Sequence, residues 1–360
     1  MEGNGEGRTS EAPRRQGLDW ARRVELASVL IASLVAAVGL WYSSAQVREE
    51  LQISKEGQIT DRYNAAVTNL GSDTMEVRLG GVYALQRIMQ DSPRDHPGIA
   101  NVLTTYVRAH ADRPPQKGAP IAADIQAALS VIATRDPAHD DYFVPDLRAA
   151  RLPGVDLGHR VPYPELRPFD PDDYRPARLE DAILTDADLT RATLTRARLH
   201  HANLTGADLT GANLDAADLS RAFLPQTDLS DAYLVGADLS GASLGGADMA
   251  ETQLFKANLT GARLGGANLK GANLKGANLQ QASFRDAHLQ DAFLANTNMK
   301  DADLTGADLT GADVAGADLT GASVTADQLT AAHVSSTTTL PSRIADHPDV
   351  RARIADYEGP

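Results

Sequence analysis

The stretch that decides the fold is ANLTGADLTGANLDAADLS, residues 202–220, in which a leucine returns every five positions. The same spacing runs from Leu179 to Val334 without a gap, over 32 positions, of which 26 are leucine. The residue two before each is alanine in 28 cases. A period of five fits neither the helical repeat of about 3.6 residues nor the period of about two in a flat strand. The pattern predicts a repeat architecture in which each unit buries its apolar face on its neighbours.

This A-(D/N)-L-x-x unit, seen as GADLT at 206–210 and 306–310, resembles the pentapeptide-repeat family. The resemblance implies a mainly β fold, a right-handed quadrilateral β-helix in which four pentapeptides make one coil. The 32 units then give about eight coils, with the leucine and the preceding alanine pointing inward. The structural core ladder is expected to begin with Leu179, Leu184, Leu189, Leu194, Leu199, Leu204, Leu209 and Leu214.

The repeat has an interrupted first part, so we expect the solenoid to cover residues 145–334. Leu147 and Leu157 already share the period, and the phase shifts by two residues across an insertion at 158–176. The insertion is expected either to cap the first coils or to bulge as a partner-binding loop. The tail 335–360 is expected either to cap the last coil, because open sheet edges need cover, or to form a homodimer.

The N-terminal region predicts a disordered tail, residues 1–23, followed by a transmembrane helix at 24–44. No charged residue occurs between Leu26 and Val47, and about 20 apolar residues suffice to span a bilayer. Trp41, near the end of the segment, suits the membrane interface.

Two other interpretations of this segment stay open: a buried core helix, and a signal peptide cleaved near Ser43-Ser44-Ala45. For a spanning helix, five arginines upstream against three basic residues just downstream favour the N-terminus inside. The expected localisation is therefore a single-pass membrane protein, with the side on which the solenoid lies left open.

Residues 45–135 have a helical period and predict a small α-helical, HEAT-like unit. Asp73 and Glu76 have the spacing of a capping box that opens one of its helices. The stretch GQITDRYNAAVTNLGSDTMEVRLGGVYALQRIMQDSPRDHP resembles a segment of actinobacterial membrane proteins that precedes pentapeptide repeats. No catalytic role is carried over from that resemblance.

The outside of the solenoid is expected to carry a candidate acidic face, because residues 20 apart stack in columns. One column contains Asp188, Asp208, Asp228, Asp248 and Asp308, and is interrupted by Asn268 and His288. Exposed aromatic residues are few: Tyr233 and Phe293 share a column, and Phe223 and Phe255 are expected on other sides.

Composition excludes several functions. The formal net charge of −14 argues against direct nucleic-acid binding, and the absence of cysteine excludes disulfides and thiol chemistry. We find no metal-ligand spacing and no phosphate-binding loop, so no catalytic residue, cofactor or metal is predicted. Catalysis needs a concave pocket, which a filled rod offers only if the helical unit forms a cleft against its end.

These observations predict a non-enzymatic, membrane-anchored scaffold that presents its solenoid to an unknown protein partner. The alternative is a DNA mimic that binds or inhibits DNA gyrase or topoisomerase. The resemblance implies this alternative, because some pentapeptide-repeat proteins resemble duplex DNA and bind gyrase.

Overall fold

The computed structural model describes residues 20–113, 115, 119–160 and 174–358 of the 360-residue chain. The predicted disordered tail lies almost wholly outside these residues, as does most of the predicted insertion at 158–176. The chain divides into two compact units, residues 1–61 and residues 62–360.

The described part of the first unit is helical and belongs to helix α1, Trp20–Leu70. The candidate span within α1, Arg22–Leu70, has a mean hydropathy of 2.1 in its most apolar window, and none of that window is buried. Leu30, Leu34 and Trp41 are each about two-thirds exposed or more. The predicted transmembrane segment 24–44 lies inside this exposed apolar helix, and a signal sequence would satisfy the same criteria.

The second unit begins with the end of α1 and three further helices: α2 at Met75–Asp91, α3 at His96–His110 and α4 at Ala123–Thr134. Their core contains Leu85, Ile99 and Leu129, which are almost wholly inaccessible to solvent.

The predicted capping box of Asp73 and Glu76 is wrong. Helix α2 begins one residue later than that box requires, with Thr74 as its N-cap and no side-chain capping bond. A capping box does form at α5, Ala326–Ala331, where the side chains of Thr325 and Gln328 exchange bonds with the backbone. Spacing alone identifies candidate caps, but the neighbouring backbone decides whether they close.

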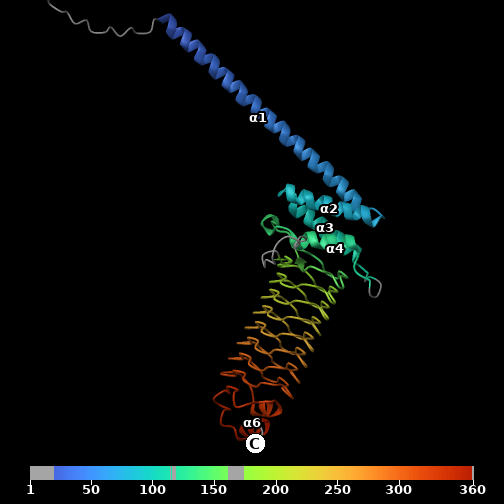
Figure 1. Ribbon diagram of the computed structural model, residues 1–360, viewed down its shortest axis with the longest axis vertical. Helices are drawn as coiled ribbons and strands as arrows, with labels where there is room; N and C mark the ends of the chain where they lie inside the picture. The colour runs from blue at the N-terminus through green and yellow to red at the C-terminus, as the bar shows by residue number, and fades with distance from the viewer. Residues whose placement is uncertain (1–19, 114, 116–118, 161–173, 359–360) are drawn as a thin grey trace, which may run out of the picture. The chain divides into compact units, whose positions relative to one another are not determined.

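The repeat region forms a stack of coils joined by parallel bridges between residues 20 apart, which Figure 1 shows below the helices. Asp188 bridges to Asp208, which bridges to Asp228, and three equivalent columns follow the other sides of each coil. Each bridge joins a single residue of one coil to a single residue of the next. The prediction of a mainly β fold therefore holds for the parallel pairing between coils, but the described coils contain no long strands. The named strands of the described chain are β1, His159–Arg160, and β2, Tyr174–Arg175, which pair antiparallel at the two ends of the insertion 158–176.

The interrupted first part belongs to the same stack. Asp146 bridges to Ile183 and Asp156 to Thr193, each across 37 positions rather than 20. The additional residues belong to the insertion at 158–176. Because the leucine period shifts by two residues across this insertion, the residues before and after it still stack in the same columns.

The corners of the coils require the left-handed backbone region. Gly206 has φ of 66°, and Ala216, in the equivalent position ten residues later, has φ of 55°. A non-glycine residue pays roughly 1–2 kcal/mol for this conformation, which explains why glycine recurs two residues after the ladder leucine.

The interior is filled. Leu204, Leu209 and Leu214 have no exposed surface, and Phe284 is accommodated in the same position with none either. Threonine replaces the small alanine at 227 and 252, and its hydroxyl donates to the carbonyl of Leu204 or Leu229, at 2.8 and 2.9 Å. The packed interior therefore excludes water at these positions, and each buried threonine hydroxyl has a hydrogen-bond partner.

Both ends of the stack are capped. At the first coil, Arg151 and Arg178 donate their backbone N–H groups to the carbonyls of Ala111 and Ala133, at the ends of α3 and α4. At the last coil, α5 and α6, Pro348–Glu358, cover the edge. Side chains there donate to edge carbonyls: Arg343 to Ala322 and Val324, and Arg353 to Ala332.

Candidate interaction surfaces

The leucines predicted as the core ladder lie in the interior and offer no surface. Each is at most 2% exposed, and the set is Leu179, Leu184, Leu189, Leu194, Leu199, Leu204, Leu209 and Leu214. Their stacking holds the coils together, so interactions with other molecules have to use the outer columns and the two ends.

The predicted acidic face exists as a column, but its carboxylates also serve the fold. Asp188, Asp208, Asp228 and Asp248 bridge in succession, then Asn268 and His288 intervene before Asp308. Each aspartate oxygen accepts the backbone N–H two residues later, as Thr210 donates to Asp208 at 3.0 Å. These are Asx turns, and where Thr or Ser follows, its hydroxyl often adds a second bond.

These bonds favour the ionised carboxylate. The hydroxyl of Thr310 holds the pKa of Asp308 below its usual range, and Thr320 does the same for the pKa of Asp318. The aspartates of the repeat are thus turned toward their own chain, which explains the D-L-T order without a ligand.

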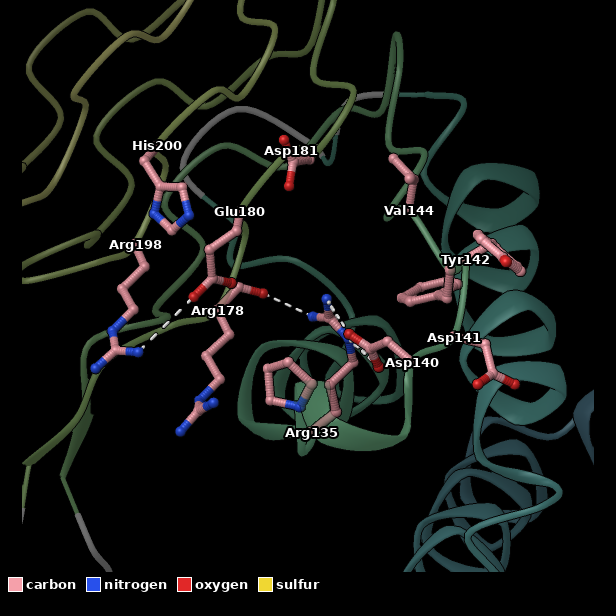
Figure 2. Close-up of a pocket in the computed structure, with 12 residues that line it drawn as sticks. Arg135, Asp140, Asp141, Tyr142, Val144, Arg178, Glu180, Asp181, Arg198 and His200 are labelled. Atoms are coloured by element: carbon pink, nitrogen blue, oxygen red, sulfur yellow. Dashed lines mark hydrogen bonds and ion pairs between the residues drawn. The ribbon is translucent and has the colours of Figure 1, made fainter.

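The structure also reveals a pocket of about 560 Å³ where the helical unit meets the first coils. Figure 2 shows its walls: the segment after α4, including η1, Pro137–His139, on one side, and the outer column of the coils on the other. It is lined by Arg135, Pro137, Asp140, Asp141, Tyr142, Phe143, Val144, Arg178, Glu180, Asp181, Arg198 and His200. From the sequence, a cleft is expected only if the helical unit lies against the end of the solenoid, and the pocket is found at that place.

Two ion pairs lie among the charged residues of this junction pocket. Arg135 contacts Asp140 at 2.9 Å, donates to the carbonyl of Arg178 at 2.7 Å and lies 4.9 Å from the ring centre of Phe143. Arg198 reaches Glu180 at 4.0 Å. The Arg135 contacts tie the helical unit to the first coil, so this part of the pocket is a structural joint.

The titratable side chains that line the junction pocket are not arranged as a metal site. Within the described ranges no group of three or more His, Asp or Glu side chains is placed to hold a metal ion. Tyr142 is fully exposed, and its phenol is the one side-chain hydroxyl group among the residues that line the pocket. Sequence reasoning missed the pocket because its two walls lie more than 30 residues apart in the chain.

A second buried polar cluster joins three helices. Asp124 of α4 is 1% exposed and accepts hydrogen bonds from Arg78 of α2, at 2.7 Å, and from the hydroxyl of Tyr106 of α3. Burial raises the pKa of Tyr106 to about 12, aided by its bond to Asp124. Burial alone would raise the pKa of Asp124, but the bonds from Tyr106 and Arg78 outweigh it and lower that pKa. The cluster is closed by its own members and serves packing.

His96, at the start of α3, lies beside a smaller pocket of about 270 Å³. Its ring is 3% exposed, with Nδ1 3.5 Å from Asp140, and burial lowers its pKa. The ring packs inside the helical unit rather than in solvent. Its contact with Asp140 extends the joint that Arg135 makes.

Coils of fixed length, a filled apolar interior and capped ends define a β-solenoid repeat protein with its interaction potential on the outside. A model of pentapeptide repeats matches in eight copies, over residues 177–211, 212–250, 252–291 and 282–321. Residues 177–321 of this chain are therefore pentapeptide repeats, and the repeat implies a right-handed β-helix for this region.

Solved structures of the same repeat are similar to this chain. HetL, from the cyanobacterium Nostoc sp. strain PCC 7120, is 28% identical, covers 54% of this chain and 85% of its own, and has a TM-score of 0.24. The plasmid-mediated fluoroquinolone resistance protein QnrB1 is 18% identical, with 49% and 94% covered and a TM-score of 0.29. A pentapeptide-repeat protein of the Arabidopsis thaliana thylakoid lumen is 28% identical, with 42% and 88% covered and a TM-score of 0.16.

With TM-scores this low, these likenesses carry no argument about function. No curated protein matches the chain.

Proposed function

We propose that this protein is a non-catalytic scaffold, anchored in a membrane by α1, that presents its solenoid to a protein partner. The observation that carries the proposal is the exposed apolar helix: its most apolar window has no buried residue. An isolated apolar helix of this length has no stable place in water, whereas a bilayer satisfies it. The chain would then be of the membrane-anchored type that the sequence resembles.

The solenoid supports the second part of the proposal. Its interior is filled by ladder side chains, and the acidic column is engaged in Asx turns. What remains available is an outer surface several coils long, which suits a protein partner better than a small substrate. The junction pocket supplies paired charges without an arranged nucleophile or base.

Gyrase binding by DNA mimicry is the alternative, and the structure offers it less support. A mimic needs an extended run of free negative charge, but Asn268 and His288 interrupt the column and its carboxylates are turned to their own backbone. Under this alternative, the purified full chain in detergent inhibits DNA supercoiling by gyrase at micromolar concentration. Under the scaffold proposal it has no effect.

The anchor is tested by replacing Leu30 and Leu34 together with aspartate. Each aspartate near the centre of a span opposes insertion by about 2.5–3.5 kcal/mol, so we expect the double variant to leave the membrane fraction. The matched control replaces Leu51 and Ile53 with aspartate; these residues are also more than half exposed on the same helix but lie outside the predicted segment 24–44. Equal fractionation of the two double variants would refute the anchor.

A further inference from the structure

One side of the solenoid carries aromatic, aliphatic and lysine side chains and no acidic residue over four successive coils. Over four successive coils its outward stretches read YLVG, QLFK, NLKG and FLAN, at residues 233–236, 253–256, 273–276 and 293–296. The corresponding stretches of the acidic column, 208–211, 228–231, 248–251 and 268–271, contain five acidic residues. On a chain of net charge −14, this side is a local exception.

The aromatic residues of this side form two adjoining columns. Tyr233, Gln253, Asn273 and Phe293 are joined by successive parallel bridges. Val235 and Phe255 stack one coil apart in the next column, where Gly236 donates its N–H to the carbonyl of Phe255. The sequence interpretation that placed Phe255 on another side is wrong, because residues before and after a ladder leucine both face outward.

These side chains are exposed and do not help to fill the interior of the coils. Tyr233 is 50% exposed, Phe293 44%, and Val235 and Phe255 38% each. The ladder leucines already fill the interior, so the rings add nothing to its packing. Most other residues that precede a ladder position are aspartate or asparagine, which solvate the surface.

Two lysines accompany the rings. Lys256 Nζ lies 5.1 Å from the ring centre of Phe255, and Lys275 Nζ lies 5.0 Å from that of Phe293. Both are within cation–π range, which holds each ammonium group beside an aromatic face. Asp215 and Asp313 stand at the two axial ends of the patch, so it has a defined length.

We propose that this aromatic–lysine side, comprising Tyr233, Val235, Phe255, Lys256, Lys275 and Phe293, binds an acidic protein segment that carries apolar side chains. The inference rests on the proposed function as a scaffold and names the chemistry of its partner. Apolar side chains of that segment cover the rings, and its carboxylates pair with the two lysines. Charge complementarity selects this occupant, because a basic segment meets two ammonium groups and a neutral one leaves them unpaired.

The size of the patch fits a short segment. Tyr233 and Phe293 lie three coils apart, about 14 Å at the usual spacing of paired strands. An amphipathic helix of roughly ten residues covers that distance at about 1.5 Å per residue. Interface centres are rich in aromatic residues, so the rings are expected to dominate affinity and the lysines to set specificity.

The test places a photoreactive phenylalanine analogue at Phe255 or Phe293 in the full chain, in cells, and identifies the crosslinked segments. The matched control position is Phe223, which is 51% exposed in another column of the same solenoid. We expect crosslinks from 255 and 293 to protein segments of net negative charge with apolar residues, in at least tenfold greater yield than from 223. Yields equal to the control, or crosslinks to lipid, to basic segments or to a second copy of this chain, would overturn the proposal.

Charge reversal provides an independent measurement. Lys275→Glu is expected to lower the crosslink yield from position 255 at least tenfold. Lys270→Glu, five residues earlier on the side that carries the acidic column, is expected to leave the yield unchanged. Equal losses in both variants would overturn the assignment to this side. If the chain without charge reversal stays in the membrane fraction but gives no more crosslinks at 255 and 293 than at 223, this inference alone fails. A soluble chain that keeps its crosslinks counts against the anchor alone.

Discussion

The solenoid and the helical unit at its first coil are stabilised in opposite ways. In the solenoid the same contacts recur in every coil, so each residue repeats a role performed many times elsewhere. In the helical unit, α2, α3 and α4 meet once around Asp124, whose partners Arg78 and Tyr106 have no substitutes. The comparison indicates that polar residues of the solenoid are individually dispensable, whereas the buried ones of the helical unit are not.

The sharpest test of that difference removes one carboxylate from each region. Asp124→Ala leaves the guanidinium of Arg78 without its buried partner and is expected to cost about 3–5 kcal/mol of unfolding free energy. Asp208→Ala removes one Asx turn among many and is expected to cost about 1 kcal/mol. Urea denaturation of both variants measures the two values, and similar costs would remove the distinction.

A second comparison concerns the apolar ladder. Leu229→Ala leaves a cavity in a bore with no exposed surface there, and about 2–5 kcal/mol of stability is lost. Phe223→Ala, six residues earlier on the adjacent side of the solenoid, changes a half-exposed side chain and stays within about 0.5 kcal/mol. Thermal unfolding followed by circular dichroism gives both results. A small effect of Leu229→Ala would mean that the coils close around missing side chains.

Alkaline pH should separate the two regions. The folded pKa of Tyr106 is raised to about 12, above its unfolded value of about 10. Its contribution is therefore complete below pH 10 and is lost as pH rises toward 12, so the helical unit should loosen first. Hydrogen exchange across this range resolves α3 from the coils, and Tyr106→Phe should abolish the alkaline step.

At acid pH the sign is reversed for the repeat. The pKa values of Asp303, Asp308 and Asp318 are lowered, in each case chiefly by the hydroxyl of the threonine two residues later. Their contribution is complete above the unfolded value of about 3.9 and is lost as pH falls through the folded pKa values. A solenoid that is least stable at neutral pH would contradict this assignment.

The smallest expected effect compares two glycines. Gly236 has φ of 66° and open space around it, so Gly236→Ala measures backbone strain alone and is expected to destabilise by about 1 kcal/mol. Gly80, on the exposed face of α2, also has open space, and Gly80→Ala is expected to stabilise by up to about 1 kcal/mol. The same sign for both variants would show that the corners do not require the left-handed region.

Much of the solenoid could be predicted from sequence because its contacts are periodic. The resemblance to the repeat family, which the spacing carries, placed Leu204 and its equivalents inside. The shift of two residues at the insertion, read from the sequence, is consistent with the pairing of Asp146 with Ile183. The role of the aspartates was missed, although the recurrence of Thr or Ser two residues after them is a signal that could have revealed it.

The helical unit, the cap on the first coil and the junction pocket depend on contacts that produce no periodic pattern in the sequence. Arg78 and Asp124 are 46 residues apart, and neither position differs in sequence from an ordinary exposed helix residue. The cap on the first coil comes from backbone carbonyls of Ala111 and Ala133, which any residue could provide. The junction pocket follows from that docking, so it could not be found before the two parts were placed together.

The proposed scaffold function depends most on α1 being a retained membrane anchor. The most direct measurement is the intact mass of the chain recovered from salt- and carbonate-washed membranes of cells that express it at native abundance. We predict a membrane-bound chain that still contains residues 24–44. A soluble chain, or one that begins near Ser43-Ser44-Ala45, would contradict the account and identify the helix as a cleaved signal sequence.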